Sequence, residues 1–340
     1  MRNIVFISHA EKGASGGAKI IYHYSEIINN LEKFTSEVIH IKKKKIAKFK
    51  NSIQKRLKLN ISKDTGWQLD EICALKNFKY SWFNHNVKTK NNLEFNKKKD
   101  FVILPEIFSH LASDLLIKKR IKYSIFVQNG YVISSTNNEK KLLKAYENAS
   151  FILSYSSDIT RCINLKFPKL KTKIINVSYA LDIGNFSYKD KKNIITYMGR
   201  KLPQHSNLVI NYIKKYLPKN WIIKNLNNLS EKSTYHELKK SKIFLAFSSF
   251  EGLPLPPAEA ALAGNHVIGY TGEGGKDYWK KPIFTEINSG NIYTFVKEIV
   301  KKIEYLNTFK TLPKKQYFDL KKMFSKEQEL RNIKNFLKFI

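Results

Sequence analysis

Residues 250–279, FEGLPLPPAEAALAGNHVIGYTGEGGKDYW, hold the pattern that decides the fold. An apolar run, Ile243 to Phe247, precedes them and predicts a buried strand. After a proline-bounded turn, the Ala-rich segment from about Pro257 to Ala263 predicts a short helix, which Gly264 can cap. The next strand starts near Val267 and opens into a glycine-rich loop. This order is typical of a parallel α/β sheet, which binds ligands at the carboxyl ends of its strands.

Two carboxylates flank the turn: Glu251 lies on the loop and Glu259 in the first turn of the expected helix. Free backbone N–H groups at the turn and the helix start can bind anions or hydroxyls. A carboxylate accepts hydrogen bonds from vicinal hydroxyls, so the pair fits two polyols joined by a phosphate bridge, which describes a nucleotide sugar. The alternative is that Glu259 only complements the helix dipole and that Glu251 is a solvated loop residue.

The whole stretch resembles the donor-site signature of retaining glycosyltransferases of the GT-B fold, in particular glycosyltransferase family 4. The resemblance implies that Glu259 binds the ribose hydroxyls and Glu251 the transferred sugar. The sequence departs from the family at Pro256-Pro257 and at Asn265-His266. The residues that match the signature are Glu251, Gly252, Leu253, Pro254, Leu255, Glu259, Ala260, Gly264, Val267 and Ile268. The donor-binding residues expected on this basis are Glu259, Gly252, Leu253, Pro254, Leu255, Gly274 and Gly275.

A second segment, Gly199-Arg200-Lys201, follows a strand expected to start at Asn193. It resembles the family segment whose arginine and a following lysine grip the donor diphosphate, and arginine suits a bidentate phosphate contact. His205 stands where the family has the lysine, so Lys201 is the residue expected to compensate. We therefore assign Glu251, Arg200 and Lys201 as catalytic; the alternative for Arg200 and Lys201 is a solvated charge pair.

The chain begins with a strand, Asn3 to Ser8, then Gly13, Gly16 and Gly17, then an amphipathic stretch from about Ala18 to Leu31. A strand, a glycine loop and a helix open a Rossmann-like domain. The spacing is not the G-x-G-x-x-G of dinucleotide-binding proteins, so no NAD site is predicted. In the resembling family this loop faces the acceptor or the donor phosphates; a plain tight turn is the alternative.

Polar side chains end two further strands. Glu106 follows the strand Asp100 to Leu104, and Gln128 and Asn129 follow the strand Tyr123 to Val127. Because α/β ligands bind at strand carboxyl ends, these residues are candidates for the acceptor side or the cleft. The full set expected there is Gly16, Gly17, Glu106, Gln128 and Asn129.

Strands that alternate with helical stretches indicate mostly parallel sheets. The expected fold is α/β and, through the resemblance, GT-B: two Rossmann-like domains that face each other across a cleft. We expect an acceptor-side domain over residues 1–185 and a nucleotide-sugar donor domain over 186–320. A C-terminal helix over 321–340 is expected to return to the first domain.

Length and composition further restrict the kind of protein that this sequence can encode. The 340 residues, 42% of them apolar, suffice for two cores. No apolar run approaches the roughly 18 residues of a membrane span, and Met1 to Ser8 is too short for a signal peptide. Cys73 and Cys162 lie far apart without metal-ligand spacing, so neither a disulfide framework nor a zinc site is expected. These features indicate a cytoplasmic protein.

The formal charge of +33 leaves three explanations open. They are a biased composition, attraction to an anionic membrane surface at about 1 kcal/mol per nearby basic residue, and nucleic-acid binding, for which no zinc-finger or RNA-binding signature is present. The lysine- and asparagine-rich stretch 42–99 is either a lipid-headgroup surface or an irregular soluble insertion. Its aromatic residues are Trp67, Phe78, Tyr80, Trp82 and Phe83.

No D-x-D occurs in the sequence, the pair of carboxylates that holds a metal ion on the diphosphate in transferases of the other common fold. We therefore expect a metal-independent hexosyltransferase that uses a nucleotide sugar as substrate and needs no cofactor. Retention of configuration is what the family resemblance implies. The expected acceptor is a saccharide or lipid-linked saccharide of a cell-surface polysaccharide, such as capsule or lipopolysaccharide, at the inner face of the cytoplasmic membrane. The alternatives are a nucleotide-sugar epimerase of the same fold and a basic nucleic-acid-binding protein.

Overall fold

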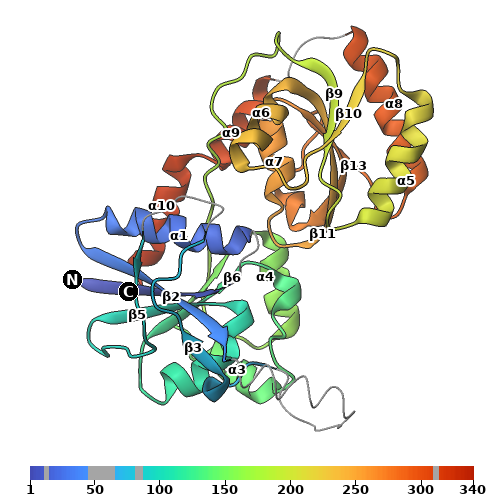
Figure 1. The fold of residues 1–340 in the computed structure, drawn as a ribbon. Coiled ribbons are helices and arrows are strands. Elements are labelled where there is room, and N and C mark those ends of the chain that lie inside the picture. Colours follow the sequence, from blue (N-terminus) through green and yellow to red (C-terminus); the bar gives the residue numbers. More distant parts are fainter. Residues whose placement is uncertain (11–14, 45–65, 81–86, 309–313) are drawn as a thin grey trace. The chain divides into compact units, whose positions relative to one another are not determined.

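The computed structural model describes residues 1–10, 15–44, 66–80, 87–308 and 314–340, which form two compact units (Figure 1). Unit 1 comprises Met1–Tyr155, Ile159–Val177 and Leu330–Ile340, and unit 2 comprises Ser156–Asp158 and Ser178–Glu329. The main division thus falls between residues 177 and 178, several residues before the expected boundary. Each unit is built on its own sheet.

The sheet of unit 1 has eight strands in the order β3-β2-β1-β5-β6-β7-β8, with β4 also paired to β2. All described pairings are parallel except that of β3 with β2. The chain runs outward from β1 to β2 on one side and to β5 on the other, so the strand order reverses beside β1. The strands are β1 (Arg2–His9), β2 (Phe34–Lys43), β3 (Ile72–Ala74), β4 (Lys88–Thr89), β5 (Asp100–Pro105), β6 (Tyr123–Val127), β7 (Ile152–Ser154) and β8 (Ile174–Asn176).

The helices of unit 1 include α1 (Gly16–Asn29), α3 (Glu139–Glu147) and α4 (Ser157–Lys166), the last of which starts in the short Ser156–Asp158 segment assigned to unit 2. Helix α1 buries Ile21, Tyr24 and Ile28, which recur every three or four residues along one face. Shorter helical turns, η2 (Glu106–Leu111) and η3 (Ser113–Ile117), follow β5 directly.

The last helix, α10 (Lys326–Leu337), ends in unit 1. Ser325 directly precedes this helix, and its hydroxyl accepts a hydrogen bond from the Gln328 N–H at 3.2 Å, as a helix-capping serine does. Near its end, the Phe336 ring stacks on Tyr24 of α1 with centroids 6.5 Å apart and contacts Phe151 at 6.1 Å. The return of the C-terminal helix to the first unit is therefore confirmed.

The sheet of unit 2 is fully parallel, in the order β10-β9-β11-β12-β13. Alternate residues of β11 face opposite cores: Phe244 and Ala246 lie in one, and Ile243, Leu245 and Phe247 in the other. A strand buried on both faces reads as a continuous apolar run, which is why the sequence predicted it. The strands are β9 (Lys192–Tyr197), β10 (Ile222–Asn225), β11 (Ser241–Glu251), β12 (His266–Glu273) and β13 (Phe284–Glu286).

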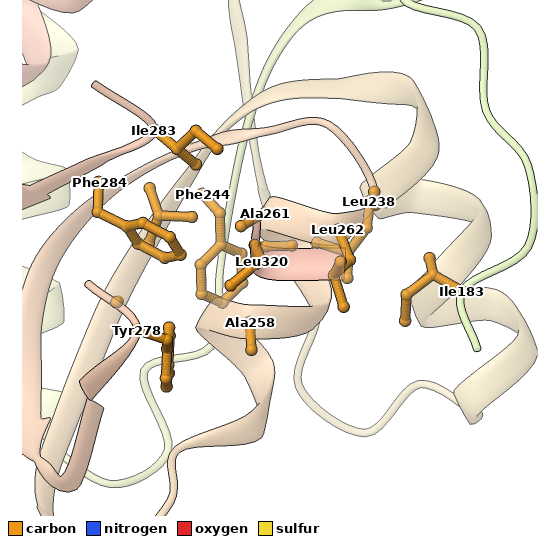
Figure 2. Packing of buried hydrophobic residues seen from close by; sticks show 14 of the residues in the cluster. Ile183, Leu238, Phe244, Ala258, Ala261, Leu262, Tyr278, Ile283, Phe284 and Leu320 are labelled. Carbon is orange, nitrogen blue, oxygen red and sulfur yellow. The ribbon is translucent and has the colours of Figure 1, made fainter. Parts of the chain in front are cut away.

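Helices cover both faces of this sheet (Figure 1). Figure 2 shows one core, where Ala258, Ala261 and Leu262 of α7 pack on Phe244 and Leu320. Small alanines let α7 approach the sheet closely, and Gly264 ends this helix with φ +83°. The helices are α6 (Glu231–Lys240), α7 (Leu255–Leu262) and α9 (Lys314–Met323) on that face and α5 (Pro203–Ile213) and α8 (Ile292–Thr308) on the other.

The expected fold class is confirmed, since both units are α/β and their sheets are parallel except at one edge strand. Helix α7 differs in one respect from the prediction. It starts at Leu255 rather than Pro257, because proline is tolerated in the first turn, where N–H groups lack helical partners. Glu259 is consequently the fifth residue of the helix, beyond the first turn.

Candidate functional site

The strand order of unit 2 reverses between β9 and β11, which are direct neighbours. Such a switch point is where open α/β sheets bind ligands, outside the carboxyl ends of the strands. The loop after β9 carries Arg200 and Lys201, and β11 itself ends at Glu251. The topology therefore brings all three residues assigned as catalytic to one edge of one sheet.

Two of these three residues form an ion pair. Lys201 Nζ lies 2.6 Å from Glu251 Oε2, with the glutamate side chain 15% exposed and the lysine side chain 46% exposed. Arg200 is exposed and makes no ion pair within the described part of the chain. This edge of the sheet therefore carries two cationic side chains. Lys201 is paired with a carboxylate, and the Arg200 guanidinium is exposed to solvent.

Backbone N–H groups add to this anion-binding character. Helix α5 starts after Leu202 and α7 after Pro254, and neither start has a side-chain cap. The first N–H groups of a helix have no partner inside it, and proline has no N–H. The first-turn donors at these two starts are therefore the N–H groups of Gln204 and His205 in α5 and of Leu255 in α7, which can bind phosphate oxygens. Helix α5 directly follows β9 and helix α7 directly follows β11, the two strands that define the switch point.

The glycine-rich loop packs directly on the proline turn. A Cβ atom on Gly274 would lie 1.9 Å from the carbonyl oxygen of Gly252, and one on Gly275 would lie 3.1 Å from Pro254 Cγ. The Tyr278 hydroxyl donates to the Pro254 carbonyl and ties the two segments together. A glycine is thus needed at position 274 because the backbones of the glycine-rich loop and the proline turn approach closely there. Contact of Gly274 and Gly275 with a donor stays a prediction.

Two non-glycine residues with positive φ lie at the ends of the neighbouring strands β11 and β12. Phe250 has φ +49° and Glu273 has φ +70°, and Glu251 is the register partner of Glu273. A bulky residue in the left-handed region is an outlier, of the kind found at functional sites. Phe250, next to Glu251 in the sequence, is 66% exposed, and no sequence pattern predicted this geometry.

Glu259 is held from helix α6. The Tyr235 hydroxyl donates to Glu259 Oε1 at 3.0 Å, and Glu231 is a second nearby carboxylate. Burial and the two nearby carboxylates raise the pKa of Tyr235, so its hydroxyl keeps its proton. Tyr235 and Glu231 were not predicted as site residues. Their four-residue spacing after the Ser230 cap, which places both on one face of a helix, is the local signal for them.

His205, which replaces the family lysine, lies in the first turn of α5. Its Nδ1 atom is 3.1 Å from the hydroxyl of Tyr270 on β12, and the two rings are perpendicular with centroids 5.6 Å apart. The imidazole is therefore fixed by a neighbouring strand rather than left free in the loop.

In unit 1, hydrogen bonds connect four of the five residues expected on the acceptor side, namely Glu106, Gln128, Asn129 and Gly17. Glu106 is buried, and its two carboxylate oxygens accept the N–H groups of Gln128 and Asn129, each at 3.1 Å. Burial raises the pKa of Glu106 to about 7. The observed role of Glu106 is to hold the turn after β6.

Gln128 connects that turn to α1. Its side-chain amide donates to the Gly17 carbonyl at 3.1 Å, and a Cβ atom on Gly17 would lie 2.1 Å from its Oε1 atom. Gly16 has open space where a Cβ atom would be, and Gly13 is outside the described residues. The ends of β1, β5 and β6 thus meet around these residues, and an acceptor contact stays a prediction.

Three of the aromatic residues considered for lipid contact, Trp67, Phe78 and Tyr80, pack against other rings of unit 1. Trp67 contacts His9 with ring centroids 4.9 Å apart and Phe108 at 5.2 Å, while Phe78 contacts Tyr80 at 5.0 Å. Rings used in such mutual packing are not a headgroup surface, so that interpretation is not supported for Trp67, Phe78 and Tyr80. Trp82 and Phe83 fall outside the described residues.

Within the described ranges, no helix has the length and apolarity needed to cross a bilayer. The same residues contain no group of three or more His, Cys, Asp or Glu side chains arranged to hold a metal ion.

Two α/β units, with charged residues gathered at the switch point of the second, have the architecture of the GT-B fold. Solved glycosyltransferase structures confirm this fold along the whole chain. HepE from Anabaena, solved with UDP, aligns with a TM-score of 0.68 at 10% identity and covers 100% of both chains. TarM aligns with a TM-score of 0.63 at 12% identity, over 100% of this chain and 98% of its own. The lipopolysaccharide outer core galactosyltransferase WaaB aligns with a TM-score of 0.60 at 15% identity, over 99% of both chains.

No protein-family model matches the sequence, and no curated protein matches it. The likeness at 10–15% identity shows the fold. The assignment of individual residues therefore depends on the geometry described above.

Proposed function

We propose that this protein is a glycosyltransferase that moves a sugar from a nucleotide-sugar donor to a saccharide or lipid-linked acceptor. The observation that carries the proposal is the gathering of Glu251, Lys201 and Arg200 at the switch point of unit 2, with Glu259 on the helix that follows. UDP is present in the solved structures of HepE, of the pneumococcal O-GlcNAc transferase GtfA and of a TarM variant from S. aureus, which supports a nucleotide donor.

The roles follow from charge and position. In this proposal Glu259 accepts the ribose hydroxyls, Glu251 accepts hydroxyls of the transferred sugar, and Arg200 and Lys201 neutralise the diphosphate. When the donor binds, its phosphates compete with Glu251 for Lys201, since they carry more negative charge than one carboxylate. That exchange frees a Glu251 oxygen for the sugar, and the helix starts of α5 and α7 supply further N–H donors.

The reaction then breaks the bond between the anomeric carbon and the diphosphate oxygen. The acceptor hydroxyl oxygen bonds to the same carbon, and its proton leaves with the departing diphosphate. Positive charge builds up on the sugar ring and negative charge on the leaving group. Once the donor is bound, the cations and N–H groups at the diphosphate stabilise that negative charge, and electrostatic stabilisation of this kind is usually the largest contribution to catalysis.

Three finer features complete the proposal: a retaining outcome, a reaction without metal, and an acceptor in cell-surface polysaccharide synthesis at the inner membrane face. The family resemblance supports retention, and the sequence without D-x-D supports catalysis by cationic side chains. The similarity to a lipopolysaccharide outer core galactosyltransferase and the charge of +33 support the acceptor class and an anionic membrane surface.

The test is a panel of UDP-, GDP- and ADP-linked sugars, with binding followed as a rise in melting temperature. At least one donor should stabilise the wild-type protein, and Glu259→Ala should abolish that shift. If no donor binds, or if Glu259→Ala leaves the shift unchanged, the assignment is wrong. Consumption of the donor without any acceptor, with conversion to an isomeric nucleotide sugar, would instead identify an epimerase.

A further inference from the structure

An open groove lies between α5 and α8 on the outside of unit 2. The two helices are neighbours on one face of the sheet, and α7 lies on the other face (Figure 1). The α5/α8 groove has a volume of about 710 Å³, which is within the range of small-molecule sites. Its apolar lining consists of Tyr212, Tyr216, Ile292, Tyr293, Val296 and Val300.

The three tyrosines of the groove are exposed to solvent. Tyr212 is 49% exposed, Tyr216 61% and Tyr293 76%. On α5, the exposed Leu208 comes four residues before Tyr212, so these two side chains share a face that differs from the buried face of the helix. A surface helix normally has one apolar face, turned to the core, and polar residues opposite it. A second apolar face on α5, next to an open groove, indicates an interaction surface.

The two segments that form the groove are basic. Residues 203–219 contain three lysines and no acidic residue, and residues 292–308 contain three lysines and two glutamates. Lys297 and Lys301 line the groove, together with one carboxylate, that of Glu304. Lys297 Nζ lies over the Tyr293 ring, 5.9 Å from its centroid. The groove therefore combines aliphatic side chains, exposed rings and cationic groups, which suits a partner with an apolar part and an anionic part.

An anionic lipid bilayer has both of these parts. Tyrosine is enriched where proteins meet the boundary between headgroups and acyl chains, because its ring is apolar and its hydroxyl can stay in contact with water. Lysine stems lie along apolar surface while their ammonium groups reach lipid phosphates. A second copy of this chain would bring the same charge of +33, so an anionic bilayer complements the charge of the groove better.

We propose that the α5/α8 groove is a membrane-docking surface, with its tyrosines in the headgroup region of an anionic bilayer and Lys297 and Lys301 on lipid phosphates. The proposal deepens the membrane contact included in the proposed function and rests on that part of it. Tyr212 comes seven residues after His205, about 10 Å along the helix, so a lipid bound in the groove does not occupy the switch point.

The experiment measures sedimentation of the full chain with vesicles of mixed phosphatidylcholine and phosphatidylserine over a series of lipid concentrations. Lys297→Glu combined with Lys301→Glu should lower the partition coefficient by about tenfold or more, since each basic residue near an anionic surface adds to binding. Tyr212→Ser, Tyr216→Ser and Tyr293→Ser combined should also lower it by about tenfold, because the apolar area of three rings is lost.

Matched controls come from α9, which packs on the opposite face of the same sheet. Lys321→Glu combined with Lys322→Glu changes the net charge by the same amount as the groove pair, and Phe318→Ser removes a ring that is also exposed. Both controls should leave the partition coefficient close to that of wild-type protein. Melting temperature and donor binding should stay as in wild-type protein for every variant; if the triple tyrosine variant fails to fold, Tyr293→Ser and the groove lysine pair decide.

Four results would overturn the inference. They are an equal fall in the groove and α9 lysine pairs, which would assign binding to net charge alone; unchanged partition after loss of the tyrosines; a dimer of wild-type protein in sedimentation velocity that the tyrosine changes abolish, which would make the groove a contact between copies; and no vesicle binding by wild-type protein. The last result leaves sugar transfer intact, because donor binding tests that part of the proposed function separately.

Discussion

At the scale of single residues, the ion pair between Lys201 and Glu251 joins two binding groups of the proposed site. Lys201 is proposed to neutralise the donor diphosphate, and Glu251 is proposed to bind the transferred sugar. In the described structure each charge is matched to the other at 2.6 Å, so neither is exposed alone to solvent. A donor that brings a diphosphate supplies a stronger partner for the lysine and hydroxyl groups for the glutamate. The pair therefore holds both binding groups in an orientation from which they can change partners.

Lys201→Met should lower sugar transfer far more than stability. A half-exposed ion pair contributes about 0–1 kcal/mol to the free energy of unfolding, so the melting temperature should change little. Loss of the cation at the leaving diphosphate should lower kcat/KM by about 100-fold, the effect of one preorganised electrostatic contact. Equal activity of the variant in a steady-state transfer assay would exclude Lys201 from the site.

Glu106 makes the stability of unit 1 depend on pH. Its pKa is raised from 4.5 to about 7 by burial, so the folded state binds this proton more tightly than the unfolded state. The associated stabilisation is full below pH 4.5 and is lost as the pH rises through 7, a difference of up to about 3 kcal/mol. Glu106→Gln cannot ionise and should lack this loss.

Urea unfolding at about pH 5 and about pH 8, on either side of the raised pKa, checks this expectation. The free energy of unfolding of wild-type protein, relative to Glu106→Gln, should fall between the two values, whereas a constant difference would show that the carboxyl does not titrate in this range. Such a constant difference would mean that the Gln128 and Asn129 N–H groups outweigh the effect of burial.

At the scale of elements, the packing of the glycine loop on the proline turn shapes the carboxyl end of β11. The Gly274→Ala methyl would overlap the Gly252 carbonyl, since its Cβ atom would lie 1.9 Å away. Overpacking of this kind costs about 1–3 kcal/mol and would displace the turn that precedes Glu259. We expect a lower melting temperature together with loss of donor binding.

Gly290→Ala provides the comparison for Gly274→Ala. Gly290 has a positive φ, +84°, but nothing lies within 4 Å of the point that a Cβ atom on it would occupy. This variant should lose about 1 kcal/mol through backbone strain and keep its affinity for the donor. If Gly274→Ala and Gly290→Ala lost donor affinity equally, the packing of Gly274 on the proline turn could not be the specific cause of the loss.

The elements that were predictable from sequence are those with strong local signals. Apolar runs such as Ile243–Phe247 became strands, and Gly264 ends α7 in the left-handed conformation. Strands β4 and β3 have only two and three residues, too few for an alternation of apolar and polar residues to be recognised in the sequence. The contact of Tyr235 with Glu259 joins two helices, so it depends on tertiary packing that no local pattern contains.

At the scale of the whole molecule, the charge of +33 should govern association with anionic surfaces. Our proposal of peripheral membrane contact predicts that the protein sediments with vesicles containing phosphatidylserine and not with neutral phosphatidylcholine vesicles. Binding should weaken as ionic strength rises, because salt screens exposed charges over about 10 Å at 0.1 M. Equal sedimentation with both vesicle types would contradict the electrostatic origin of the contact.

The α/β class of both units was predictable because each repeats a strand-loop-helix order, and the GT-B fold was predictable because residues 250–279 resemble a known donor-site signature. The identities of the donor base, the sugar and the acceptor were not predictable from the sequence, since they depend on pocket shape and backbone groups. Sequence could place Glu251, Arg200 and Lys201 at strand ends, but the ion pair of Glu251 with Lys201 required the structure.

The central claim is that the acids and cations at the switch point of unit 2 bind an activated sugar. Its most direct test is titration calorimetry of the best-binding nucleotide sugar with wild-type protein, Glu259→Ala and Arg200→Ala. Glu304→Ala, an exposed glutamate on α8, serves as the control. We predict saturable binding to wild-type and control proteins and at least about tenfold weaker binding to both site variants. Equal affinity in all four proteins would contradict the claim.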